Sequence, residues 1–369
     1  MDLDSIIGLV IIFSIGIFLF LDRKNIEIHG PLLLRKTKNF NKKIEGISLR
    51  FSKFFNIFGV LAIISVYVSF ALFFYFSLIE LFKPPKIAPV QVVLPSLPML
   101  CNSSFVLCVP AYFWFIIIPI IAISHELAHA FLARISNLRI KSMGYAFLLV
   151  LPAFFVELDE KKLKKIELIK RLKIYAAGSF ANFIVGILAL LLLGIIANII
   201  FLNFGGVEVE ILDESSGKNT TLTILKINNE KVDDITELAI VMKRIRENKT
   251  QNVTIQTINS SFDITINESI KIRFIKNAYY PKNEFTQANR EVLLPVLLTL
   301  REFLFWLFFL NIGIGMFNLL PIKPLDGGLF FYDLLEEKFG KKGEVVFKFL
   351  STFTILLLLL LILKSIFKF

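Results

Sequence analysis

The chain has 369 residues, of which 56% are hydrophobic and 40 are phenylalanine, and its mean hydropathy is +0.71. This apolar share lies well above that of a soluble globular domain and indicates an integral membrane protein. The formal net charge is +11, but the basic residues gather in short loops beside apolar runs, as orientation in a bilayer requires. We therefore expect a lipid bilayer as partner and no nucleic acid.

Six apolar runs are each close to the roughly 20 residues that cross a bilayer. The first follows the acidic start MDLD and lacks the basic region and cleavage site of a signal peptide, so we expect it to remain as a helix. The runs lie near 5–21, 55–82, 111–135, 174–202, 292–318 and 344–364.

The loops between these runs predict how the chain is oriented. Loop 22–53 carries nine Lys/Arg against three acids, and 159–173 carries seven basic residues, so both should be cytoplasmic. Loop 83–110 has only Lys83 and Lys86 and should lie outside. Counting spans then places the N-terminus and residues 205–290 outside, in a multi-pass protein of the cell membrane.

The segments assigned to the outside carry two further signals. Cys101 and Cys108 share the outer loop, where a disulfide and two free thiols both fit the spacing. Every N-x-S/T triplet also falls in an outer segment, either as a glycan acceptor or as a chance product of an Asn/Thr-rich composition. These triplets begin at Asn102, Asn219, Asn248, Asn252, Asn259 and Asn267.

Two segments do not follow the pattern of spanning helices. The stretch GYAFLLVLPAFFVEL (144–158) is short, contains Pro152 and is rich in strand-forming residues, so we expect a re-entrant β-hairpin or a sheltered loop. Segment 205–290 is polar and alternates like strands around an amphipathic helix from Asp234 to about Glu247. It predicts a small α+β domain, or a structural spacer between spans.

The expected fold is therefore an all-α membrane bundle of about six spanning helices with a re-entrant hairpin and a small extracytoplasmic α+β domain. We divide it into an N-terminal two-helix region (1–110), a membrane core (111–204), the outer domain (205–290) and a C-terminal membrane region (291–369).

The third apolar run ends in SHELAHAFLAR, which places ionisable groups at membrane depth. His125 and His129 are four residues apart, so both project from one helix face and can hold a single ion. Glu126 can reach a water on that ion, and HExxH on a helix is a zinc-hydrolase signature. Because a charged group in a helix centre costs about 2.5–3.5 kcal/mol, we expect a function for this cluster.

A catalytic zinc needs a third protein ligand. Asp326 in FNLLPIKPLDGG (317–328) is the candidate, because it is an acid in an apolar break directly after the fifth span. Its alternative role is to cap the helix that follows. The remaining histidine, His29, lies in a basic loop and is interpreted as a surface residue.

Four motifs in this order resemble the site-2 protease family of intramembrane zinc metalloproteases: HELAH, the hairpin stretch, AAGSFANF (176–183) and NLLPIKPLDGG. The resemblance covers roughly 111–335. The insert between spans four and five stands where many members carry a PDZ-like domain, although it has no obvious glycine loop for binding a peptide carboxylate.

This resemblance implies one Zn²⁺ per chain, held by His125, His129 and Asp326, with Glu126 as general base. Residues that would organise the site or the substrate path are Asn182, Gly178, Asn318 and Pro324. The first two have a second interpretation, since small residues and buried amides also pack membrane helices together.

The implied activity is hydrolysis of a peptide bond in a transmembrane segment of a substrate protein, near the cytoplasmic face. A helix hides its backbone carbonyls, so the substrate must unwind, and an edge within Gly144–Leu158 could hold it as an added strand. Two alternatives use the same residues differently: a membrane transporter that binds a passing metal ion, and a catalytically silent scaffold.

Overall fold

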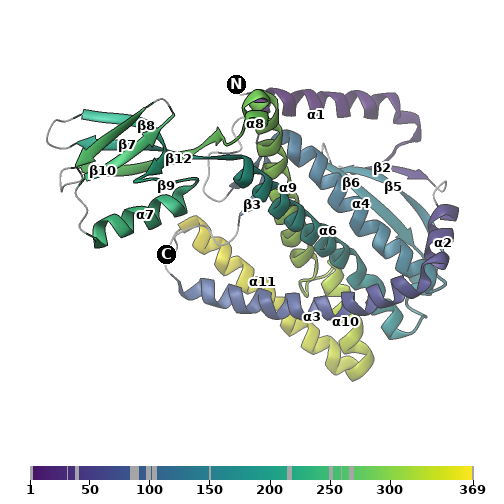
Figure 1. The fold of residues 1–369 in the computed structure, drawn as a ribbon. Helices are drawn as coiled ribbons and strands as arrows, with labels where there is room; N and C mark the ends of the chain where they lie inside the picture. The colour runs from purple at the N-terminus through teal and green to yellow at the C-terminus, as the bar shows by residue number, and fades with distance from the viewer. Residues whose placement is uncertain are drawn as a thin grey trace. The chain divides into compact units, whose positions relative to one another are not determined.

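The structure is a computed structural model that describes residues 3–30, 32–37, 41–83, 91–96, 101, 106–148, 151–213, 218–248, 252–258, 260–265 and 270–367. The chain forms two compact units. The first comprises Met1–Ala189 with Trp306–Phe369, and the second is Leu190–Phe305. Two helices, α6 (Leu168–Asn203) and α9 (Arg290–Asn318), run from one unit into the other (Figure 1).

Five helices in the described part of the chain are long and apolar enough to cross a membrane, as expected for a multi-pass membrane protein. They are α3 (Ser52–Phe82), α4 (Ala111–Ile135), α6, α9 and α11 (Lys341–Phe367). The first predicted span forms α1 (Leu3–Leu21), whose apolar part, Ile6–Leu21, is shorter than these five. A sixth crossing therefore stays a prediction.

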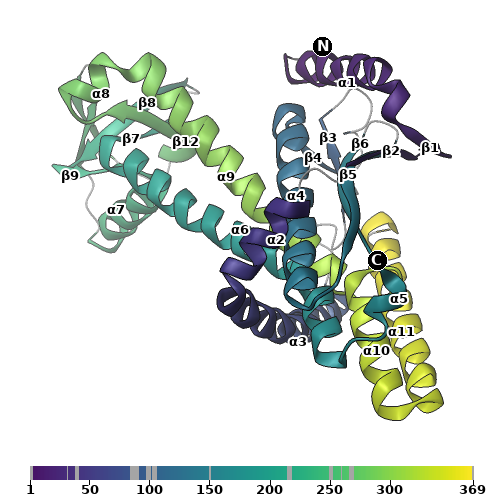
Figure 2. The ribbon, with the colours of Figure 1, turned by 90° about the vertical axis from the view of Figure 1, so that its right-hand side faces the viewer.

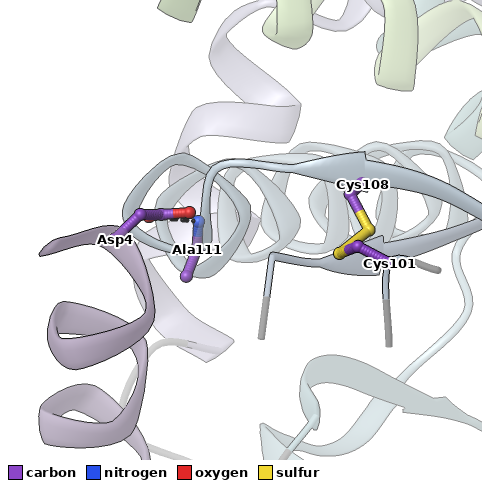
Figure 3. The surroundings of a disulfide bond; sticks show 4 residues. All are labelled: Asp4, Cys101, Cys108 and Ala111. Atoms are coloured by element: carbon purple, nitrogen blue, oxygen red, sulfur yellow. Dashed lines mark hydrogen bonds between the residues drawn. A yellow bond between two sulfur atoms is a disulfide. The ribbon is translucent and has the colours of Figure 1, made fainter. Parts of the chain in front are cut away.

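Helix ends in the first unit are joined in pairs by polar contacts. The carboxylate of Asp4 accepts a hydrogen bond of 2.8 Å from the Ala111 N–H, so α1 and α4 begin together (Figure 3). The Lys364 ammonium, near the end of α11, donates to the carbonyls of Glu80, Leu81 and Lys83 at the end of α3. These carbonyls have no partner within their own helix, and the lysine satisfies them.

The loop after α3 contains two short parallel strands, β3 (Val92–Pro95) and β4 (Val106–Val109). Cys101 and Cys108 form a disulfide there, so of the two alternatives for these cysteines the bonded one is confirmed (Figure 3). The Asp4–Ala111 contact lies beside this loop in the same view.

A four-stranded antiparallel sheet lies beside α4 (Figures 1 and 2). Its order is β1 (Glu27–His29), β2 (Leu32–Thr37), β5 (Ile140–Leu148) and β6 (Leu151–Leu158). The predicted hairpin is confirmed as β5 and β6, with β5 starting at Ile140, whereas β1 and β2 come from what the sequence showed only as a basic loop. Re-entry of the hairpin into the bilayer stays a prediction.

The pairing of β2 with β5 depends on Gly144. This glycine lies opposite Lys36, and a Cβ at its position would come within 1.8 Å of the Arg35 carbonyl oxygen. Only glycine allows the two backbones to approach this closely. Strand β6 therefore remains as the outer edge of the sheet, and it packs against α4.

The core of the first unit lies where α3, α4, α6 and α10 (Asp326–Phe339) meet. Small residues such as Ala128, Ala176 and Ala177 are buried there, which lets the helices approach closely. Shorter elements complete the unit: η1 (Arg23–Asn25), α2 (Asn41–Arg50) and α5 (Glu160–Leu163).

The second unit contains the predicted α+β module. Its strands are β7 (Phe204–Asp213), β8 (Lys218–Ile227), β9 (Glu230–Lys231), β10 (Asn252–Thr257), β11 (Ser261–Thr265) and β12 (Ile270–Pro281), in the sheet order β11-β10-β8-β7-β12 with β9 beside β8. Helix α7 (Ile235–Glu247) is capped by the Asp234 carboxylate and buries Leu238, Val241 and Ile245 against the sheet. A short helix, α8 (Glu284–Ala288), leads into α9.

Part of the sequence interpretation of this module is not addressed by the structure. Its position outside the membrane, its likeness to a PDZ domain and the four domain boundaries stay predictions. Three of the glycosylation triplets, at Asn102, Asn259 and Asn267, lie outside the described residues.

Candidate metal centre

Three side chains from two distant parts of the chain converge in the first unit. The Nε2 atoms of His125 and His129 are 3.1 Å apart, and Asp326 Oδ2 lies 3.0 Å from the first and 3.3 Å from the second. Two ligands of a tetrahedral zinc lie about 3.3 Å apart when each is about 2.0 Å from the ion. The spacing of the three atoms therefore fits one zinc ion.

The hydrogen bonds around these atoms also favour a cation. His129 Nδ1 carries the ring proton and donates it to the Ile174 carbonyl at 2.7 Å. In the neutral ring Nε2 then has no hydrogen, and its lone pair faces the cluster. Asp326 Oδ2 is buried without a hydrogen-bond donor in the described structure. His129 Nε2 and Asp326 Oδ2 are therefore two acceptor atoms 3.3 Å apart, and such atoms repel one another unless a positive ion lies beside them.

The other histidine is held through an amide. Asn182 on α6 is fully buried, and its side chain contacts His125 Nδ1 at 3.3 Å. The hydroxyl of Ser124 donates to Asn182 at 3.2 Å. Because the amide has one oxygen and one nitrogen, it can serve either protonation state of Nδ1 while it fixes the ring plane.

Gly178, one turn before Asn182 on α6, leaves the space in front of the histidines open. A Cβ at this position would lie 2.4 Å from His129 Nε2 and 2.5 Å from His125 Nε2. Any side chain here would occupy the volume on which the three ligand atoms converge. The Gly-x-x-x-Asn pattern is therefore explained by contact with the cluster itself, in addition to helix packing.

The loop between α9 and α10 brings Asp326 to the histidines. A Cβ on Gly327 would lie 2.0 Å from the Leu319 carbonyl, and one on Gly328 would lie 2.4 Å from Ile322. The two glycines of LDGG thus let the first turn of α10 pack directly on the backbone of this loop. The N-cap of α10 is Leu325, and Asp326 points at the histidines, so its alternative role as a helix cap is wrong.

A second polar cluster anchors α10 to α6. The Arg171 guanidinium, which is buried, lies 3.4 Å from the Asp333 carboxylate and 2.7 Å from that of Glu337. The Tyr175 hydroxyl donates to the same Asp333 oxygen at 3.1 Å. These contacts connect the helix that carries Asp326 with the helix that carries Gly178 and Asn182.

Glu126 lies between the cluster and the edge of the sheet. Its Oε2 accepts a hydrogen bond of 3.0 Å from the Val156 N–H on β6. Because backbone groups alternate along a strand, the N–H and carbonyl of Phe154 point away from β5 in the same direction as those of Val156. Pro152 has the same orientation, so its missing N–H costs the β5–β6 pairing nothing.

Two cavities open onto the cluster from different sides. One, of about 660 Å³, touches Glu126, His129 and Asp326 and carries charged groups including Lys36, Glu157, Glu160 and Lys164. The other, of about 380 Å³, touches His125, Glu126 and Asp326 and has mainly apolar walls. Asn182, Asn318 and Pro324 line the second cavity, so the remaining predicted site residues all lie at this centre.

Comparison with known proteins agrees with this arrangement. A model of peptidase family M50 matches residues 113–362, which include the HELAH and LDGG segments. The chain belongs to peptidase family M50. This is the site-2 protease family, so the resemblance drawn from the motifs is confirmed, and its members are zinc metallopeptidases that act within membranes.

One relative is an uncharacterised protein of Methanocaldococcus jannaschii, which is 29% identical over 256 residues. The match covers 65% of this M50 chain and 64% of that protein's length, so the chain spans less than two thirds of this relative.

Some groups at the M50 centre had no signal in the sequence. The Ile174 carbonyl and the Val156 N–H are backbone atoms, which any residue could supply. Leu34 and Lys36 of β2 line the charged cavity although they precede the family match. Lys36 is paired there with Glu27 at 2.8 Å, and this hydrogen bond raises the pKa of the lysine.

Proposed function

We propose that this protein is an intramembrane zinc metalloendopeptidase that hydrolyses a peptide bond in a transmembrane segment of another membrane protein. The observation that carries the proposal is the convergence of His125 Nε2, His129 Nε2 and Asp326 Oδ2 within 3.0–3.3 Å, beside Glu126. Membership of family M50 supports the reaction class.

In this function the three converging side chains hold one Zn²⁺ and Glu126 moves the proton. Zinc bound at this site would acidify a water molecule and polarise the scissile carbonyl. Glu126 accepts the proton of the attacking water and then delivers it to the nitrogen of the leaving amine. Its hydrogen bond from Val156 holds one carboxylate oxygen in place, which leaves the other oxygen for this transfer.

The substrate binds as a strand along β6. A transmembrane helix must unwind before its carbonyls can be attacked, and an unwound backbone in a membrane needs new hydrogen-bond partners. Phe154, whose backbone groups point away from β5, offers such partners next to Glu126. The substrate strand thereby passes the metal centre with its backbone satisfied.

Asn182 orients His125, and Gly178 keeps the ligand space open. Asn318 and Pro324, which line the apolar cavity, shape the path of the substrate. Together with Glu126 these residues complete the site without adding a further metal ligand.

We further propose that the N-terminus and residues 205–290 face the outside of the cell and that the site opens toward the cytoplasm. The disulfide lies beside the joint start of α1 and α4, which fits an oxidising exterior at that end. Lys36 and Lys164 line the charged cavity, as expected for the cytoplasmic side.

The test uses the full chain purified in detergent with a model transmembrane substrate. Glu126→Gln should keep one zinc per chain and lose cleavage, because the amide cannot accept the proton. Glu167→Gln is the matched control, since Glu167 is exposed and forms an ion pair with Lys170 at the surface. Cleavage by the Glu126→Gln protein would contradict the proposal, and metal flux without cleavage in liposomes would favour a transporter.

A second variant tests the strand edge. Phe154→Pro removes one outward N–H, and Pro152 shows that this side of β6 accepts proline without loss of the β5 pairing. We expect zinc content to stay at the wild-type level and cleavage to fall at least about tenfold, the equivalent of one hydrogen bond of about 1.5 kcal/mol. Unchanged cleavage would mean that β6 has a structural role only.

A further inference from the structure

The apolar cavity has a wall built from the helix that carries the HExxH motif. Ile118, Ile121 and Ala122 line it, at positions that share one face of α4 with His125 and Glu126. The cavity therefore begins at the metal ligands and extends one to two helical turns toward the start of α4. It has a volume of about 380 Å³, within the range of cavities that bind small groups.

The opposite walls come from two other elements. Pro152 and Ala153 of β6 form one, and Ile314 of α9 forms another. Most of the lining is aliphatic, and its polar groups lie near the metal ligands or at the loop before α10. In the part bounded by Ile118, Ile121 and Ile314 an apolar side chain fits better than a polar one, because the side chains of these three residues offer no hydrogen bond.

The position of the apolar cavity relative to β6 indicates which part of a substrate reaches the cavity. Val156 lies beside Glu126, whereas Pro152 and Ala153 lie farther along the same strand and line the cavity. A peptide that runs along β6 past Glu126 therefore passes this cavity next. Side chains alternate across a strand, so one residue adjacent to the scissile bond turns toward α4 and into the cavity.

We propose that this cavity is a specificity subsite for a large apolar side chain, such as leucine or phenylalanine, on one residue that flanks the scissile bond. Ala122 sets the size limit, because it is the smallest residue on the α4 wall and a longer side chain there would fill the space. The inference rests on the proposed protease function and adds the substrate class that the site selects.

The test compares Ala122→Phe with Ile123→Phe in the full chain. Ile123 is the next residue on α4 but is 42% exposed on the outer surface of the unit, so it adds the same bulk away from the cavity. Each protein is assayed for zinc content and for cleavage of transmembrane peptides that carry alanine, leucine or phenylalanine on either side of the cleaved bond.

We expect wild type and Ile123→Phe to prefer leucine or phenylalanine over alanine at one flanking position. Ala122→Phe should lower the ratio of large-residue to alanine peptide cleavage by roughly 10–200-fold, the discrimination that apolar pockets achieve. Ala122→Val should shift the ratio in the same direction by less, and it decides the question if the phenylalanine variant does not fold.

An unchanged leucine-to-alanine ratio in a zinc-loaded Ala122→Val or Ala122→Phe protein would overturn the subsite. An equal loss on all peptides with full zinc content would overturn it as well. Failure of the protease function itself would be seen differently, as absence of cleavage by wild type or as cleavage by Glu126→Gln.

Discussion

The first unit, which carries long apolar helices and is called the membrane unit below, and the α+β module of the second unit use polar residues in opposite ways. In the module, charged side chains pair on exposed strand surfaces, as Lys276 does with Glu208 and Arg273 with Glu210. In the membrane unit, His125, Asn182 and Arg171 are at most 9% exposed. His125 and Asn182 belong to or contact the group of metal-ligating side chains. Arg171 anchors the helix that presents Asp326.

This difference reflects what a polar group contributes in each region. Exposed ion pairs contribute about 0–1 kcal/mol each, so the module is stabilised by its apolar core and tolerates changes at its charges. Buried polar groups in a membrane are costly and persist where they hold a site together. Variants that alter one group in each region therefore test this difference between the two regions.

The largest effect is expected from Gly178→Ala. The added methyl would lie within 2.6 Å of three histidine atoms, so the ligand atoms cannot keep their positions. We expect zinc content and cleavage both to fall close to zero, as measured by metal analysis and by the peptide assay. Gly194→Ala on the same helix is the control, because nothing lies within 4 Å of its Cβ position. A zinc-loaded Gly178→Ala protein would show that this glycine serves helix packing alone.

Asp333→Asn should have the next largest effect. It leaves the buried Arg171 with the more exposed Glu337 and weakens the contact between α6 and α10. We expect a loss of about 1.5–3 kcal/mol in unfolding free energy, the range for hydrogen bonds to charged groups, together with weaker zinc binding. Thermal unfolding with and without zinc measures both. If zinc affinity did not change, α10 would not depend on this cluster for its position.

Acid should release the N-terminal strands. Hydrogen bonds from Asn25, Tyr145 and Arg35 hold the pKa of Asp22 below its ordinary value of 3.8. Since the folded pKa is the lower one, this contribution to stability is present above pH 3.8 and is lost as the pH falls through the folded value. The protection of β2 amides, measured as hydrogen exchange relative to the intrinsic rate at each pH, should fall in acid, and Asp22→Asn should remove that dependence. Equal pH dependence in both proteins would assign it to another group.

The smallest effect is expected from Glu208→Gln in the module. Its partner Lys276 is exposed, so the change in unfolding free energy should stay below about 1 kcal/mol and cleavage should not change. A larger loss, seen in chemical unfolding of the full chain, would contradict the contrast between the two regions.

Sequence reasoning located the side chains of the site but not the backbone groups that hold them. His125, His129 and Asp326 could be found because ionisable residues stand out in apolar runs and HExxH has a fixed helical spacing. The Ile174 carbonyl and the Val156 N–H could not, since a backbone group has no identity in the sequence. The reason for Gly178 also became visible only when its distance to the histidines was known.

The fold shows the same limit. Apolar length predicted the long helices, and strand-forming residues predicted the hairpin. Strands β1 and β2 were missed, because their short, charged sequence has no two-residue alternation that separates it from a loop. The pairing of β2 with β5 depends on Gly144, because a Cβ at this position would collide with the Arg35 carbonyl, and this is a long-range contact.

Zinc X-ray absorption on the purified chain is the most direct test of the central claim. We predict one zinc per chain with two imidazole nitrogens and a carboxylate oxygen among its ligands, and loss of that oxygen and of most of the metal in Asp326→Asn. A spectrum and zinc content that stayed the same in Asp326→Asn would contradict the metal centre described here.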